Sequence, residues 1–169
     1  MVKGEIFMKK TIFSVLSTLV GVGIGMISGV AIEKNNSHKE EKKWKQLADK
    51  HLALMQLFNQ WMVTKQEGKS IVDYFHKESI KSIAIYGMSY VGERLYDELK
   101  DSDIEVKYAI DKNADGIYSD VEIVTPQEEL KEVDAIVVTP VFYFDEIVEA
   151  LEKKTESEVL SLEDILYEL

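Results

Sequence analysis

The chain has 169 residues, enough for one domain and an appendage, and it lacks cysteine, which excludes disulfides and thiolate metal ligands. The three histidines, His38, His51 and His76, are far apart in sequence and form no zinc-binding pattern. The net charge is −11, and residues 81–169 carry −15, from 8 Lys/Arg and 23 Asp/Glu. Because so acidic a segment repels phosphate backbones, we expect no nucleic-acid partner.

Residues 1–10 form a short basic tail, and residues 11–32, TIFSVLSTLVGVGIGMISGVAI, contain no charged side chain. As a helix they would extend about 33 Å, which is enough to cross a hydrocarbon core of about 30 Å. The alternative is a cleaved signal peptide, but the uncharged run is long for one and its end matches a cleavage site poorly. We therefore expect a transmembrane helix, with the lipid bilayer as a partner through residues 11–32.

Small residues recur every fourth position within this segment, at Ser17, Gly21, Gly25 and Gly29. On a helix they share one face, where a second helix can approach closely. This spacing predicts a homodimer through Gly21, Gly25 and Gly29, although glycine is also simply common in membrane helices.

The lysines flanking residues 11–32 predict the orientation of the chain. Five lysines follow the segment closely (Lys34, Lys39, Lys42, Lys43 and Lys45), whereas three precede it (Lys3, Lys9 and Lys10). Positive charge favours the cytoplasmic side, so we expect a single-pass protein of the cell membrane with its C-terminal domain in the cytoplasm.

Residues 33–43 are charged and polar and predict a linker, and residues 44–78 predict a helical pair. Apolar residues recur at helical spacing from Trp44 to Met62, and Gly68 ends this pattern. Ser70 with Asp73 forms a capping box that begins a second, short helix. The apolar stripe is expected to pack either on the domain that follows or on a second copy of the chain.

Residues 79–169 alternate apolar strands with helical segments. The expected strands cover residues 80–86, 104–110, 121–124, 135–139 and 159–161. The expected helices cover residues 90–100 and 142–153, and single turns of helix are expected at residues 126–130 and 162–167. Continuous apolar strands separated by helices indicate a parallel sheet covered on both faces. The fold class is therefore α/β, a Rossmann-like parallel five-stranded sheet in the order 3-2-1-4-5.

The stretch Gly87-Met88-Ser89-Tyr90-Val91-Gly92 follows the first strand and opens the first helix. This is the position of the G-x-G-x-x-G fingerprint of dinucleotide-binding proteins, with Ser89 in place of the second glycine. We expect Gly87 to form the tight turn and Gly92 to let the helix approach the sheet. The Ser89 side chain obstructs a phosphate slightly, and its hydroxyl either bonds a ligand or caps the helix.

Asp111 ends the second strand, where an acid bonds ribose hydroxyls in folds of this type and disfavours a 2′-phosphate. We therefore expect NAD or a nucleotide-sugar as the ligand, if Asp111 does more than form a turn. Thr139 and Pro140 end the fourth strand and should line the crevice, since ligands lie beyond the carboxyl ends of the strands.

The stretch IAIYGMSYVGERLYDELKDSDIEVKYAIDKNAD resembles the Rossmann-type domain at the front of bacterial sugar acetyltransferases and sugar epimerase-dehydratases of surface-polysaccharide pathways, and some CoA-binding domains. The resemblance covers about residues 80–169. It implies a nucleotide or nucleotide-sugar on Gly87, Ser89 and Gly92, with Asp111 at a ribose.

Two Tyr-x-x-x-Lys pairs have the spacing of a short-chain dehydrogenase, Tyr96 with Lys100 and Tyr108 with Lys112. Both precede the fourth strand, after which the catalytic pair of those enzymes comes. No Ser-His-Asp set or substrate domain is evident either. The sequence thus favours a membrane-anchored nucleotide- or nucleotide-sugar-binding module without catalysis. The alternative is a degenerate fold that serves as a membrane-tethered interaction scaffold.

Overall fold

The structure is a computed structural model that describes residues 39–169. The chain divides into two compact units, residues 1–49 and residues 50–169, and the second contains the sheet. The expected membrane segment, residues 11–32, and its glycine face lie outside the described residues. Within residues 39–169, no helix is both long enough and apolar enough to cross a bilayer.

A helix covers residues 39–66 of the described chain, so residues 39–43, the end of the stretch for which the sequence predicted a linker, are helical. Residues 39–43 are all Lys or Glu, which are strong helix formers, so the charged stretch extends the helix. Gly68 follows the helix with φ of +75°. Helix α2 (Ile71–Glu78) begins with the predicted capping box, in which Asp73 Oδ2 accepts a hydrogen bond from the Ser70 backbone N–H at 2.8 Å.

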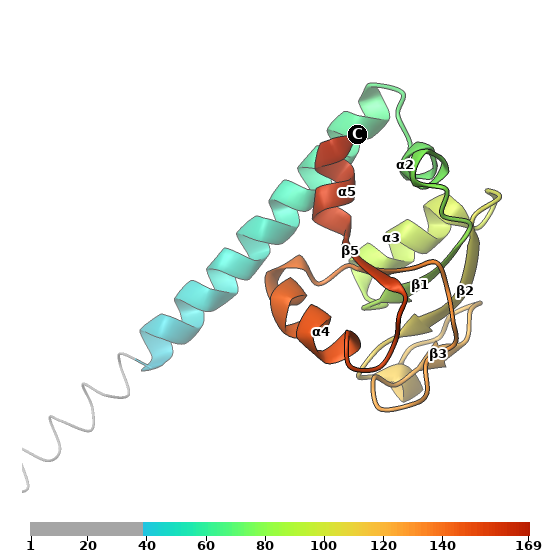
Figure 1. The fold of residues 1–169 in the computed structure, drawn as a ribbon. Helices are drawn as coiled ribbons and strands as arrows, with labels where there is room; N and C mark the ends of the chain where they lie inside the picture. The colour runs from blue at the N-terminus through green and yellow to red at the C-terminus, as the bar shows by residue number, and fades with distance from the viewer. Residues whose placement is uncertain (1–38) are drawn as a thin grey trace, which may run out of the picture. The chain divides into compact units, whose positions relative to one another are not determined.

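The five strands form one parallel sheet in the order β3-β2-β1-β4-β5, as the sequence predicted. Figure 1 shows this sheet with helices on both faces. The strands are β1 (Ser82–Tyr86), β2 (Glu105–Ile110), β3 (Ile123–Val124), β4 (Ala135–Val138) and β5 (Glu158–Ser161). The remaining helices are α3 (Tyr90–Leu99), α4 (Phe144–Leu151) and α5 (Leu162–Glu168), with single 3₁₀ turns η1 (Ala114–Gly116) and η2 (Val141–Tyr143).

The single turn of helix predicted at residues 126–130 is wrong, because these residues form a turn and a bend without any helix. The Glu128 carboxylate accepts a hydrogen bond from the Thr125 backbone N–H at 2.7 Å, and the Glu128 N–H donates to the Thr125 carbonyl at 3.1 Å. Five residues cannot offset the cost of helix nucleation when Leu130 alone supplies an apolar contact. As a result, β3 connects to β4 through the loop of residues 125–134 rather than through a helix.

The two faces of the sheet are covered unequally. One face packs Ile83, Ile85 and Val137 against α2, α3, α5 and the long helix, which contributes Leu57 and Trp61. The opposite face carries Ala84, Tyr86, Tyr108, Ile110, Ile136 and Val138. It packs against α4 through Ile147 and Leu151, and against the loop before β4 through Val133. Because no helix follows β3, this second face has room for a cavity at its carboxyl edge.

Candidate binding site at the carboxyl ends of the strands

Gly87 forms the turn between β1 and α3 with φ of +92°. A Cβ atom here would lie 2.7 Å from Pro140 Cγ and 2.8 Å from Thr139 Oγ1. Both the backbone conformation and the packing against the end of β4 therefore require glycine.

Gly92 lies in the first turn of α3, where the helix passes the β1–α3 turn closely. A Cβ atom at this position would lie 2.2 Å from the backbone oxygen of Gly87. A backbone oxygen cannot move aside as a flexible side chain can, so only glycine permits this approach.

Ser89 is the N-cap residue of α3, and its backbone is extended with φ of −93° and ψ of −159°. Its hydroxyl makes no capping hydrogen bond, and the residue is exposed. The sequence left two roles open for this hydroxyl, namely to bond a ligand or to cap the helix. The structure shows no capping hydrogen bond from it. The hydroxyl is therefore available to a ligand at the start of the helix.

Asp111 ties the end of β2 to the glycine turn. Its Oδ2 accepts a hydrogen bond from the Met88 backbone N–H at 2.8 Å, and its Oδ1 accepts one from the Asn113 backbone N–H at 2.9 Å. The Asp111 carboxylate, which we expected to bond a ribose, thus also fixes the turn between β1 and α3. Each carboxylate oxygen has a second lone pair, so a ligand hydroxyl can still bind there.

Thr139 holds the same turn from the other side and is only 3% exposed. Its hydroxyl donates to the Gly87 carbonyl at 2.7 Å, and its backbone N–H donates to the Tyr86 carbonyl at 3.0 Å. Thr139 therefore supports the loop from inside the fold, whereas the neighbouring Pro140 reaches the cavity surface.

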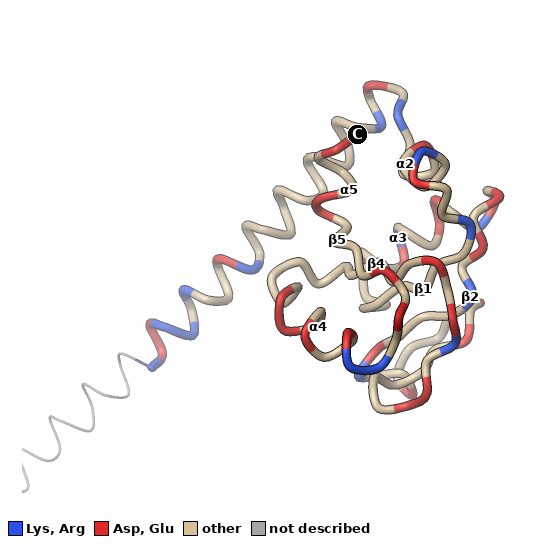
Figure 2. The backbone as a smooth tube through the Cα atoms, in the orientation of Figure 1, with Lys and Arg blue, Asp and Glu red and all other residues tan. Residues whose placement is uncertain are grey.

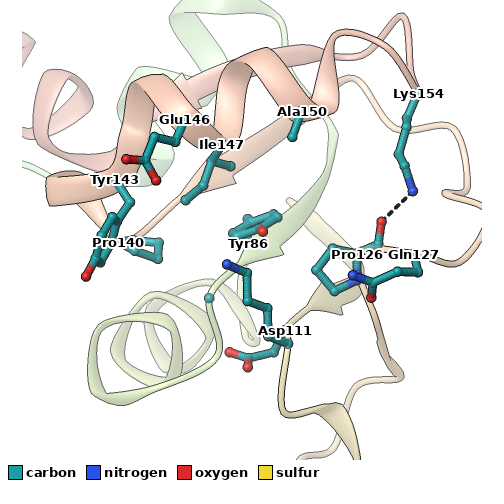
Figure 3. A pocket seen from close by; sticks show the side chains of 12 residues that line it. Tyr86, Asp111, Pro126, Gln127, Pro140, Tyr143, Glu146, Ile147, Ala150 and Lys154 are labelled. Atoms are coloured by element: carbon teal, nitrogen blue, oxygen red, sulfur yellow. Dashed lines mark hydrogen bonds between the residues drawn. The ribbon is translucent and has the colours of Figure 1, made fainter.

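A cavity of about 730 Å³ lies at the carboxyl ends of β1, β2 and β4, under α4 (Figure 3). Of the five residues predicted for the site, Gly87 and Asp111 border this cavity, whereas Ser89, Gly92 and Thr139 do not. The lining residues are Tyr86, Gly87, Asp111, Lys112, Pro126, Gln127, Pro140, Tyr143, Glu146, Ile147, Ala150 and Lys154.

Tyr86, the last residue of β1, lies between the α4 side chains and Asp111 in Figure 3. The residue is 7% exposed, yet its hydroxyl has no hydrogen-bond partner among residues 39–169. Burial, and secondarily the negative charge of Asp111, raises the pKa of the Tyr86 phenol above its ordinary value of 10.0. The phenol is therefore protonated at neutral pH and can donate a hydrogen bond to a ligand.

Charged groups of both signs surround the cavity. Lys154 donates to the Pro126 carbonyl at 2.5 Å and so joins the end of α4 to the β3–β4 loop (Figure 3). Lys112 and Glu146 form no ion pair with any residue of the described part of the chain. The site thus combines apolar walls with separate donors and acceptors, which is typical of small-molecule sites.

The α4 side of the cavity was not predicted from the sequence. Four residues of η2 and α4 line the cavity, namely Tyr143, Glu146, Ile147 and Ala150. Their spacing of three and four places them on one helical face directly after Pro140. This periodicity could have predicted the cavity-lining face of α4 from the sequence, because α4 follows the strand that borders the expected ligand crevice.

No group of side chains suited to a metal ion occurs within residues 39–169. Comparison of the chain with protein-family models, curated proteins and solved structures found no match. The fold and the cavity therefore define the class of the molecule by themselves. It is an α/β protein with a parallel sheet in the order 3-2-1-4-5 and a cavity at the carboxyl edge of that sheet.

Proposed function

We propose that this protein is a membrane-anchored module that binds a nucleotide, such as NAD, or a nucleotide-sugar. We propose further that it catalyses no reaction itself. The main support for this proposal is the position of the cavity at the carboxyl ends of the strands. The strand order reverses between β1 and β4, and open α/β sheets bind ligands in the crevice at this switch point. A volume of about 730 Å³ also falls within the range of small-molecule sites.

The lining residues suit the parts of such a ligand. Ile147, Ala150 and Pro126 offer apolar walls to a base or a sugar ring. The Tyr86 phenol and the Asp111 carboxylate supply a donor and an acceptor for hydroxyl groups. Lys112 and Lys154 provide donors toward a phosphate. Ser89 is exposed at the start of α3 but lies outside the cavity lining, so its hydroxyl reaches only a ligand that extends beyond the cavity. The resemblance to polysaccharide-pathway domains suggests cell-envelope polysaccharide synthesis as the setting.

The tyrosines offer no evident general base. The raised pKa of Tyr86 keeps its phenol protonated. Tyr108 is buried, and its hydroxyl donates to the Lys131 carbonyl at 2.7 Å. Lys100, the partner of Tyr96 in the other Tyr-x-x-x-Lys spacing, forms an ion pair with Asp97 at 2.9 Å. These contacts support binding without catalysis.

The alternative function is a degenerate fold that acts as an interaction scaffold. Two observations favour it. Both oxygens of Asp111 already bond the protein's own backbone, and Ser89 replaces the glycine that would let a pyrophosphate approach. The ligand experiment below separates the two functions.

The proposal is tested by thermal-shift screening of the full-length chain against NAD, NADP, CoA and nucleotide-sugars. A ligand at 100 times its dissociation constant should stabilise the fold by about 2.7 kcal/mol. Ala150→Trp fills the cavity from α4 without removing a hydrogen bond, so it should abolish this shift. Glu149→Trp is the matched control, because Glu149 is exposed on the same helix and does not line the cavity.

Two outcomes would contradict binding in this cavity. In the first, none of these ligands stabilises the chain, which favours the scaffold. In the second, the Ala150→Trp variant responds to the ligand as strongly as the Glu149→Trp variant does.

A further inference from the structure

The long helix has two apolar faces, and only one of them is covered by its own domain. Residues 51–64 contain no charged side chain, which Figure 2 shows as an uninterrupted tan stretch. Leu57 and Trp61 point into the core. Leu52, Met55 and Met62 are 50%, 61% and 63% exposed, so a helix face rich in large apolar side chains faces solvent.

The exposed face has the spacing of a coiled-coil seam. Leu52, Met55, Asn59 and Met62 are separated by three, four and three residues, which is the alternation of a and d positions in a heptad. In this heptad the buried Leu57 falls at position f, on the side opposite the seam. A second helix can therefore pack along the seam without displacing the domain.

We propose that the occupant of this seam is the same helix of a second copy of the chain, parallel and in register. Asn59 supports this choice. It is the polar residue within the exposed seam and takes an a position. An asparagine at a single a position of a parallel dimer lies opposite its own counterpart and fixes register at some cost in stability.

The direction of the chain supports the parallel arrangement independently. If residues 11–32 anchor the chain, as proposed above, two copies leave the membrane with the same polarity. Only residues 33–43 separate the proposed anchor from the stretch 44–78, which contains the seam. The long helices of the two copies would therefore lie close together. The dimer does not depend on ligand binding, so it can fail or succeed separately from the proposed nucleotide site.

Cysteine cross-linking tests this proposal cleanly, because the natural chain contains no cysteine. The full-length variants Leu52→Cys and Met62→Cys should each form a disulfide-linked homodimer rapidly under a mild oxidant. Ala53→Cys, at the neighbouring b position, is the control and should cross-link far more slowly. An antiparallel pair would instead link Leu52→Cys to Met62→Cys when the two variants are mixed.

The proposal is overturned if Leu52→Cys and Met62→Cys cross-link no faster than Ala53→Cys, or if the mixed product dominates. A second measurement separates the seam from the expected glycine face at Gly21–Gly29. Met55→Glu puts like charges opposite each other at the seam and leaves Gly21–Gly29 unchanged, so it should slow the cross-linking of Leu52→Cys in the full-length chain about tenfold or more. An unchanged cross-linking rate of Leu52→Cys in a folded chain that also carries Met55→Glu would mean that the seam is not an interface.

Discussion

At the scale of single residues, the glycine turn is fixed by side chains from two other strands. Asp111 holds the Met88 N–H from β2, and Thr139 holds the Gly87 carbonyl from the end of β4. The turn is thus shaped before any ligand arrives, and such preorganisation reduces the cost of binding.

Thr139→Val tests this support by removing one hydroxyl, which contacts the Gly87 carbonyl at 2.7 Å and the Tyr86 carbonyl at 3.1 Å. Valine keeps the shape of the side chain but removes the hydroxyl that bonds the Gly87 carbonyl in a buried place. The variant should lose about 1–3 kcal/mol of unfolding free energy, measured by urea denaturation. Thr139→Ser keeps the hydroxyl and should be more stable than Thr139→Val. Equal stability of the wild type and Thr139→Val would show that this hydroxyl contributes nothing.

At the scale of elements, one carboxylate joins three helices. Glu98 on α3 accepts hydrogen bonds from Trp61 Nε1 at 2.8 Å and from Ser70 Oγ and the Ile71 N–H, both at 3.1 Å. Lys65 Nζ lies 2.5 Å from the same side chain, which is 9% exposed. The end of the long helix and the start of α2 are therefore both fastened to α3.

Glu98→Gln should destabilise the protein by about 2–4 kcal/mol, because it removes the charge that pairs with Lys65 and replaces one acceptor oxygen by a donor. Urea unfolding followed by Trp fluorescence measures this loss. The control is Glu93→Gln on the same helix, which removes only an exposed contact with Arg94 at 3.5 Å. If the two variants are equally stable, Glu98 does not fasten the helices.

The elements themselves were largely predictable from the sequence, whereas their contacts were not. Continuous apolar runs located the strands, and the Ser70–Asp73 spacing located α2. The turn of helix expected at 126–130 was wrong, because this segment has only Leu130 to pack against the core. The bond from Asp111 to the Met88 N–H joins residues far apart in sequence, so it depends on tertiary geometry that no local pattern encodes.

At the scale of the whole molecule, acidic and basic residues are distributed unevenly along the chain. Acidic residues are spread over the α/β unit, whereas lysines gather at the start of the described helix (Figure 2). A net charge of −15 over residues 81–169 disfavours contact with anionic lipid, and the lysines near the proposed anchor favour it. This asymmetry is what we expect if, as proposed, residues 11–32 anchor the chain and the α/β unit lies in the cytoplasm.

Fractionation with protease protection tests this placement. The full-length chain should pellet with membranes, and its C-terminal domain should resist protease in intact protoplasts and be digested after lysis. Digestion of the domain in intact protoplasts would contradict the cytoplasmic placement. Recovery of the chain outside the membrane fraction would contradict the anchor.

Binding of a ligand in the cavity under α4 can be observed by methyl-resolved NMR of the full-length chain with a nucleotide or nucleotide-sugar identified in the thermal screen. The methyl groups of Ile147 and Ala150 line the cavity, whereas those of Ile83 and Ile165 lie in the core on the opposite face of the sheet. If the ligand binds in this cavity, the Ile147 and Ala150 signals should shift saturably, whereas those of Ile83 and Ile165 should not move. Unchanged Ile147 and Ala150 signals at saturating ligand would contradict binding in this cavity.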